Sequence, residues 1–121
     1  MTTNDKLAAL FKSIDEKDTD AFVSFLSENV VFRFGNADFV NGKASVRDVV
    51  HGFFGSIKAL HHVIHESWDS GSASVCHGIV TYTRHDSSTL TVPFANILTA
   101  ENGLITRYLI FVDVSGLYTS A

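Results

Sequence analysis

The chain has 121 residues, a formal net charge of −4, 45% hydrophobic residues, 12% aromatic residues and a single proline. This length predicts one domain over residues 1–121, with a core large enough to fold without disulfides or a structural metal. The nine Lys and Arg residues are spread singly, which excludes nucleic acid and acidic membranes as partners. One cysteine, no leader-like start and no apolar run of ~20 residues predict a cytoplasmic protein without a membrane span.

Two helices are predicted near the start of the chain. Apolar residues recur at helical spacing over residues 4–16, which predicts an amphipathic helix. Asp18 or Asp20 can cap a second, short helix, whose apolar face is expected to run as far as Leu26. The first quarter of the chain therefore predicts a helical pair.

A strand and a third helix follow. The β-branched and aromatic run at 30–34 predicts the strand. From Lys43 the apolar residues step by three and four as far as Leu60, which is typical of an amphipathic helix. Gly52 and Gly55 lie within this pattern and are unfavourable there relative to Ala, so we expect a close backbone approach beside them.

The second half of the chain predicts four antiparallel strands. Alternation replaces helical spacing, and turn signals separate strands over 61–69, 73–86, 89–100 and 104–114. The dipeptide Asn102-Gly103 is one that a tight hairpin prefers. The order α-α-β-α-β-β-β-β predicts an α+β fold, with helices covering one face of a curved antiparallel sheet.

The segment HHVIHESW, residues 61–68, has the composition of a metal site. A zinc-protease motif, however, requires two His one helical turn apart on a helix, with the Glu between them. Here Glu66 follows the last His, and the segment is predicted to be a strand with His61 and His65 on one face. The other face then carries His62, Ile64, Glu66 and Trp68.

A metal held by His61 and His65 with His77 or His85 is the alternative for these histidines. No second cluster of ligand residues supplies the remaining positions of such a site. No phosphate-binding glycine loop and no nucleophile-elbow serine motif occur either. The sequence therefore predicts no metal and no other cofactor.

The run TYTRHD, residues 81–86, offers the clearest candidate for chemistry. Strand alternation would place Tyr82, Arg84 and Asp86 on one face. If that face lines a cavity, Arg84 would keep Asp86 ionised, and the carboxylate could accept a proton or orient a water. The alternative is an exposed ion pair beside a hairpin, which would be worth at most about 1 kcal/mol.

Four other polar residues are weaker candidates. Asn96 lies in an apolar run and must find hydrogen-bond partners if it is buried. Cys76 is expected to be a small core residue. Asp113 follows a strand and is expected to cap a turn, and Asp38 lies in the loop before the third helix.

Several segments together resemble the nuclear transport factor 2-like superfamily, close to its SnoaL-like, polyketide cyclase-like branch. They are EKDTDAFVSFLSENVVF, NGKASVRDVVHGFF, TVPFANILTAENGLI and RYLIFVD, and the likeness covers nearly the whole chain. The resemblance implies a cone-shaped α+β barrel around an apolar pocket. It also implies homodimers that pair through the outer face of the sheet.

The resemblance also implies which family chemistries are missing. Ketosteroid isomerases use a Tyr and two Asp at positions that correspond here to Leu10, Phe34 and Ala95. Limonene-epoxide-hydrolase-like enzymes use an Arg-x-Asp, matched by Arg84 and Asp86, and a last-strand Asp that corresponds to Ile110. Neither machinery is complete, although Asp113 or Asp38 could replace the last carboxylate.

The resulting hypothesis is a cofactor-independent enzyme of the isomerase, cyclase, dehydratase or hydrolase type, acting on a small hydrophobic molecule. Asp86 would be the general acid/base, Arg84 would set its ionisation, and Tyr82 would bind a substrate oxygen. The pocket lining is predicted to include Phe34, Trp68, Ala95, Tyr108 and Ile110. A non-catalytic module that binds a ligand or a protein is the alternative.

Which face of strand 89–100 lines the pocket is open from the residues alone. Pro93, Ala95 and Ile97 form one face, and Val92, Phe94 and Asn96 form the other. Both sets are apolar enough to be buried. The resemblance to the isomerases favours the first set.

Overall fold

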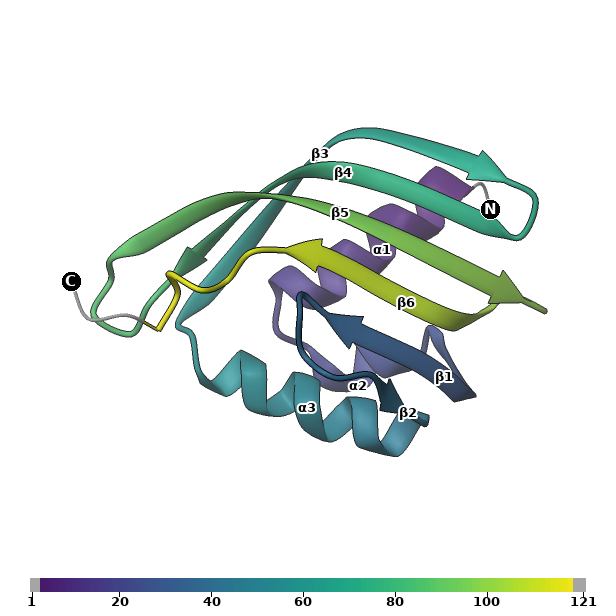
Figure 1. Ribbon diagram of the computed structural model, residues 1–121, viewed down its shortest axis with the longest axis horizontal. Coiled ribbons are helices and arrows are strands. Elements are labelled where there is room, and N and C mark those ends of the chain that lie inside the picture. Colours follow the sequence, from purple (N-terminus) through teal and green to yellow (C-terminus); the bar gives the residue numbers. More distant parts are fainter. Residues whose placement is uncertain (1–2, 119–121) are drawn as a thin grey trace.

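The computed structural model describes residues 3–118 as a curved sheet with helices on one side (Figure 1). The elements in chain order are α1 (Thr3–Asp15), α2 (Thr19–Val23), β1 (Leu26–Phe34), β2 (Val40–Asn41), α3 (Lys43–Gly55), β3 (Ala59–Ser70), β4 (Ala73–Thr83), β5 (Thr89–Glu101) and β6 (Leu104–Val112). The predicted α+β class and the order of the main elements are confirmed. No helix within residues 3–118 is long and apolar enough to cross a membrane.

The sheet is mixed, where a purely antiparallel one was expected. Its strand order is β2-β1-β6-β5-β4-β3, and β1 pairs with β6 in parallel. The short strand β2 lies in the segment that was predicted to be a loop, and it pairs with β1 through Val31 and Phe32. β1 can pair with β6 in parallel because α3 and the strands β3 to β5 provide the long connection that parallel neighbours need.

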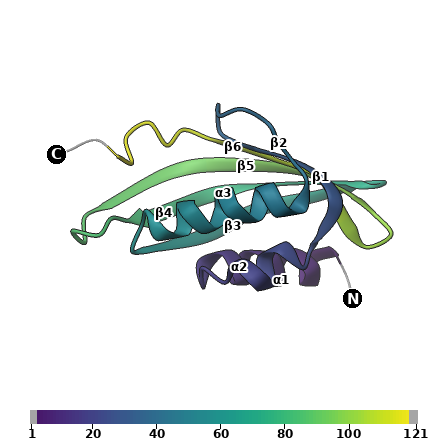
Figure 2. The same cartoon turned by 90° about the horizontal axis from the view of Figure 1, so that it is seen from below.

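The three helices lie on the concave face of the sheet (Figure 2). The apolar stripe of α1 is buried at Leu7, Leu10, Phe11 and Ile14, as its spacing predicts. The core sits between these helices and the inner sheet face, and the outer face carries no helix (Figure 2).

The helix boundaries differ from the predictions at two places. α2 starts after Asp18, whose carboxylate accepts a hydrogen bond from Ala21 N at 3.1 Å, but it ends at Val23, and Leu26 begins β1. α3 ends at Gly55, five residues before the predicted end, where Ser56 N bonds the carbonyls of Gly52 and Phe53. The apolar pattern continues beyond Gly55 because Ile57 and Leu60 are also buried, outside the helix.

Glycines mark the places where the chain turns or bends. Asn102 and Gly103 have φ of 53° and 81°, as the predicted tight hairpin between β5 and β6 requires. Gly78 in β4 leaves room for β3, since a Cβ there would lie 1.8 Å from Val63 O. The close approach expected at Gly52 and Gly55 is wrong, because a Cβ at either position would meet no described heavy atom within 4 Å.

A bulge in β3 reverses the facing of its second half. The pairing with β4 shifts between Ile64 and Glu66, so His65 is the extra residue. His62 and Ile64 therefore face inward, whereas Glu66 and Trp68 face outward beside His77 and Val75. The predicted sharing of one face by these four β3 residues is wrong, because one inserted residue moves every later side chain to the opposite face.

Candidate functional site

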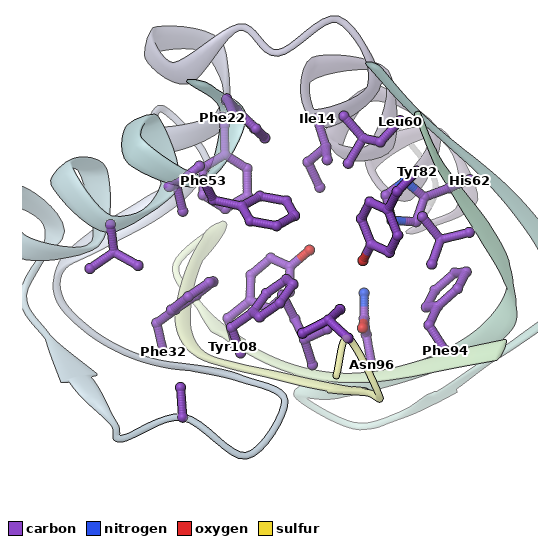
Figure 3. Close-up of a pocket in the computed structure, with 18 of the residues that line it drawn as sticks. Ile14, Phe22, Phe32, Phe53, Leu60, His62, Tyr82, Phe94, Asn96 and Tyr108 are labelled. Atoms are coloured by element: carbon purple, nitrogen blue, oxygen red, sulfur yellow. The ribbon is translucent and has the colours of Figure 1, made fainter. Parts of the chain in front are cut away.

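A cavity of about 220 Å³ lies between the concave sheet face and the helices (Figure 3). Its wall is mostly aromatic and aliphatic, and the polar side chains in it are His62, Asn96, Tyr82, Tyr108 and Tyr118. No Lys, Arg, Asp or Glu of the described chain belongs to this lining. The arrangement suits a small, largely uncharged ligand, since a charge without a partner is costly to bury.

The mouth of the cavity lies between three segments that are far apart in the sequence. Ala37 in the loop between β1 and β2, Val49 on α3 and Tyr118 near the C-terminus line the cavity and are also exposed. Tyr118 OH is 2.9 Å from Ser56 Oγ, which ties the segment after β6 to the end of α3. These residues therefore form the rim through which a ligand would enter.

The most chemically distinctive group is a carboxylate–histidine pair at the cavity wall. Asp15, the last residue of α1, places Oδ1 2.6 Å from His62 Nδ1 and accepts a hydrogen bond from His62 N on Oδ2 at 3.0 Å. The side chains of His62 and Asp15 are 10% and 21% exposed. His61 is more loosely attached, with Nδ1 3.6 Å from the same carboxylate and 73% of its side chain exposed.

The contacts of His62 fix the orientation of its ring. Phe11 and Phe94 pack against the imidazole with centroid distances of 4.8 and 5.1 Å. An ionised Asp15 can only accept a hydrogen bond, so Nδ1 is the donor to it and Nε2 is left as the ring nitrogen that can exchange a proton. Within residues 3–118 Nε2 has no hydrogen-bond partner, and His62 belongs to the cavity lining.

Three further polar groups come from β4, β5 and β6. Tyr82 and Tyr108 are buried, and burial is the main reason that the pKa of each phenol is raised. Within the described chain Asn96 Oδ1 and Tyr108 OH are buried without a hydrogen-bond partner. Figure 3 shows the Tyr108 hydroxyl and the Asn96 amide pointing into the cavity, with the Tyr82 hydroxyl directed toward Asn96.

Arg84 and Asp86, in contrast, lie outside the cavity. β4 ends at Thr83, so strand alternation does not extend to these residues. Arg84 donates to the carbonyls of Leu117 and Gly116, both at 2.9 Å, and thereby anchors the segment after β6. The expectation that both residues face the pocket is thus corrected, because the chain leaves the sheet before reaching them.

Asp86 has the contacts of a turn residue. Its Oδ1 accepts hydrogen bonds from Ser88 N at 2.9 Å and Ser88 Oγ at 2.6 Å. These bonds, more than the charge of Arg84, lower the pKa of this fully exposed carboxyl. A catalytic role for Asp86 stays a sequence-based prediction, and this geometry does not favour it.

The other predicted lining residues divide into two groups. Phe34, Tyr108 and Ile110 belong to the cavity wall, together with Tyr82. Trp68 is 51% exposed and stacks on His77 on the outer face, because the bulge turned it outward. Ala95 also lies away from the cavity.

The inner face of β5 is the one that the resemblance did not favour. Phe94 and Asn96 are 4% and 2% exposed and line the cavity, whereas Pro93, Ala95 and Ile97 face outward. Register explains this facing, since Asn96 pairs with the buried Cys76 and with Ile110. The sequence offers two apolar faces on this strand, and only the neighbouring strands decide between them.

The remaining candidates follow their structural expectations. Cys76 is 1% exposed, and burial raises the pKa of its thiol to about 11. Asp113 accepts a hydrogen bond from Ser115 N at 2.9 Å, as a turn cap does, and Asp38 is exposed. Neither carboxylate is part of the cavity lining. Across residues 3–118, no three His, Cys, Asp or Glu side chains cluster closely enough to hold a metal ion.

The Asp15–His62 pair was not predicted from the sequence. Its members are 47 residues apart, and Asp15 resembles any acidic residue near a helix end. Two features of the sequence could have indicated the pair. A carboxylate lies near the end of the predicted first helix, and alternation places His62 on the same strand face as the apolar Ile64. That signal identifies a pair only when the packing of α1 against β3 is known.

Solved structures of known proteins share this fold. A Catenulispora acidiphila hypothetical protein with a ketosteroid isomerase-like fold, in complex with trimethylamine, matches with a TM-score of 0.85 at 14% identity, covering 94% of this chain and 89% of that one. A putative polyketide cyclase from Xanthomonas campestris matches with a TM-score of 0.80 at 16% identity, covering 94% and 92%. An M. tuberculosis epoxide hydrolase of the limonene-epoxide-hydrolase-like kind matches with a TM-score of 0.78 at 15% identity, covering 89% and 80%.

These likenesses place the chain in the nuclear transport factor 2-like, ketosteroid isomerase-like class of folds. The model of the SnoaL-like domain matches residues 7–108, so the chain belongs to the SnoaL-like family, as its sequence motifs predict. A search of curated proteins gives no match. The family and the fold are therefore established, and the reaction is not.

Proposed function

We propose that the protein is an acid–base enzyme that transfers a proton on a small, mainly apolar substrate bound in the cavity. His62 Nε2 accepts the proton, and Asp15 holds the ring and stabilises the imidazolium. The observation that carries this proposal is the 2.6 Å contact between Asp15 Oδ1 and His62 Nδ1 at the wall of an otherwise apolar cavity. A positioned histidine of this kind typically contributes 10²–10⁴-fold to a rate.

The chemistry requires no cofactor. A C–H or O–H bond of the substrate breaks, the proton bonds to Nε2, and the electron pair remains on the substrate. Return of that proton to another atom completes an isomerisation, and its delivery to a departing hydroxyl completes a dehydration. Asp15 keeps Nδ1 protonated throughout, so the ring presents the same nitrogen in both steps.

A generic proton-transfer probe tests the role of His62 before any natural substrate is known. 5-Nitrobenzisoxazole is small, aromatic and uncharged, and a base that removes its C3 proton breaks the N–O bond and releases a coloured phenolate. We expect the protein to accelerate this reaction above buffer, and His62→Gln to remove about 10²-fold or more of the acceleration. His61→Gln and His77→Gln are the controls and should leave the rate within about twofold, since both rings are substantially exposed.

The second candidate function is binding without turnover. It is supported by the lining, in which Phe34 and Ile110 occupy positions where the related enzyme families named above have carboxylates. Saturable binding of an apolar probe, with equal benzisoxazole rates in the parent protein and His62→Gln, would establish this candidate and refute the acid–base role.

We further propose that two copies pair through the outer sheet face. Support comes from the resemblance and from the large apolar side chains on that face, where Val63, Trp68 and Phe111 are 42%, 51% and 53% exposed. Light scattering should report a dimer for the parent protein, and Phe111→Asp should shift it to the monomer. A monomeric parent protein would refute the pairing.

A further inference from the structure

Two buried polar atoms in the cavity have no partner. Asn96 is 2% exposed and Tyr108 is 0% exposed, yet Asn96 Oδ1 and Tyr108 OH form no hydrogen bond within the described chain. Native proteins leave few such atoms, because an unmade hydrogen bond costs stability. An apolar pair at these positions would serve the fold better, so the two groups point to a ligand.

The surroundings of Tyr108 exclude a purely structural use of its hydroxyl. The ring lies between Phe22 and Phe32, with centroid distances of 5.9 and 5.6 Å. These contacts use the faces and edges of the ring, and a phenylalanine would make them equally well. The hydroxyl oxygen points into the cavity (Figure 3). Burial also raises the pKa of this phenol, so it remains a hydrogen-bond donor at every physiological pH.

The two atoms define complementary requirements. The carbonyl oxygen of Asn96 can only accept a hydrogen bond, and the hydroxyl of Tyr108 can donate one. A hydroxyl on the ligand meets both, since it donates to Asn96 and accepts from Tyr108. A ketone or ether meets only the second, and a hydrocarbon meets neither.

The charge of the ligand follows from the rest of the lining. No Lys, Arg, Asp or Glu of the described chain belongs to the cavity lining, and Asp15, which contacts the lining residue His62, is engaged with that ring. A buried carboxylate, phosphate or ammonium would therefore lack a counterion. The size is also bounded, because about 220 Å³ exceeds the roughly 150 Å³ of a known cavity that holds benzene.

We propose that the cavity selects a neutral, mainly hydrocarbon alcohol or phenol somewhat larger than benzene, whose hydroxyl donates to Asn96 Oδ1 and accepts from Tyr108 OH. This ligand class deepens the proposed function and rests on it only in using the same cavity. Asn96 and Tyr108 act as specificity-determining residues, whereas His62 performs the proton transfer.

The test compares p-cresol with p-xylene, in which a methyl group replaces the hydroxyl. Calorimetry or ligand-observed NMR gives the dissociation constant of each probe, and their ratio measures the preference for the hydroxyl. The two probes differ in their free energies of transfer from water, and this difference is the same for every variant. Dividing the affinity ratio of a variant by that of the parent protein therefore removes it. We expect Tyr108→Phe and Asn96→Leu each to reduce the preference roughly 5- to 150-fold, the range typical of an unmet buried hydrogen bond.

Thr91→Val is the control. It removes a hydroxyl from β5, the strand that carries Asn96, but that hydroxyl lies outside the cavity lining and is 2.8 Å from Thr81 Oγ1, so the preference should stay within twofold. Tyr108→Phe should melt no lower than the parent protein, since the atom removed has no partner in the described chain. A lowered melting temperature would instead show that the hydroxyl serves the fold, and would count against the proposal.

Three results would overturn the ligand class. They are no saturable p-cresol binding up to its solubility, an unchanged preference in both variants, and 4-methylbenzoate binding as tightly as p-cresol. These binding measurements involve no reaction, so they can succeed while the His62-dependent reaction of 5-nitrobenzisoxazole fails, or the reverse. Failure of the ligand class and failure of the proposed function are therefore distinguishable.

Discussion

Two of the carboxylate–histidine pairs that the structure describes at β3 lie on opposite faces of the sheet. Asp15 and His62 are 2.6 Å apart with exposures of 21% and 10%, and Glu66 and His77 are 3.2 Å apart with exposures of 61% and 40%. The residue types are nearly the same. Of these four residues, only His62 lines the described cavity, where a proton acceptor can act on a bound molecule.

The bulge at His65 decides which of the two pairs lies on the inner face of the sheet. If β3 continued in regular alternation through His65, without the bulge, Glu66 would lie on the inner face with His62 and Ile64. The bulge instead sends Glu66 and Trp68 to the outer face. The comparison teaches that the facing of a side chain, rather than its type, decides whether such a pair can support chemistry.

The largest expected effect comes from breaking the inner pair while sparing the outer one. Asp15→Asn removes the charge that fixes the His62 tautomer, so we expect the benzisoxazole rate to fall about 10²-fold. Glu66→Gln is the matched change in the outer pair and should alter the rate less than about twofold. Equal losses in the two variants would mean that the inner pair has no special role.

The stability of the fold at alkaline pH depends on ionisable groups that are buried on the inner face. Burial raises the pKa of Cys76 from 9.0 to about 11, and burial also raises those of Tyr82 and Tyr108. The unfolded chain thus ionises first, so the stabilising contribution is complete below pH 9 and is lost as pH rises toward 11. Urea titrations should show the free energy of unfolding falling over this range, by on the order of 2 kcal/mol for Cys76 alone. Cys76→Ala should flatten the decline, and an unchanged slope would contradict the assignment.

Two glycine substitutions test the close approach of β3 and β4 beside the bulge. Gly78→Ala would place a methyl group 1.8 Å from Val63 O, and we expect it to destabilise the fold by about 1–3 kcal/mol or more. Gly52→Ala, in α3 with no described atom within 4 Å, should stabilise by about 0.5–1 kcal/mol. Chemical denaturation measures both, and equal effects of the two changes would argue against the steric account.

The smallest effect is expected at the outer pair itself. Glu66 and His77 form an exposed side-chain contact, so Glu66→Gln should change the free energy of unfolding by less than about 1 kcal/mol. The same urea experiment measures it. A larger loss would show that the outer pair is covered in solution, as pairing of two copies through that face would require.

The sequence predicted the fold because its signals are local. The spacing of Leu7, Leu10 and Phe11, the cap at Asp18 and the Asn102-Gly103 turn each depend on a few adjacent residues. The parallel pairing of β1 with β6 has no local signal, and neither does the bulge at His65. Both follow from packing between segments that are distant in the chain.

The site could be predicted only in part for the same reason. Tyr82 and Tyr108 lie on strands whose inner faces follow from simple alternation, and the structure places both at the cavity. Alternation gave the wrong facing for Asp86, because β4 ends three residues earlier. It also gave the wrong facing for Trp68, because the bulge lies between that residue and the first half of β3. The pairing of Asp15 with His62 depends on how α1 lies across β3, which no periodicity encodes.

Arg84 has a consequence that reaches beyond its hydrogen bonds. By holding the carbonyls of Gly116 and Leu117 it fixes the segment that carries Val114 and Tyr118 to one side of the cavity mouth. This segment belongs to no strand of the sheet, so its residues can change without disturbing sheet pairing. Related proteins could therefore evolve new ligand preferences by exchanging a few residues here, while the Asp15–His62 pair and the sheet stay the same.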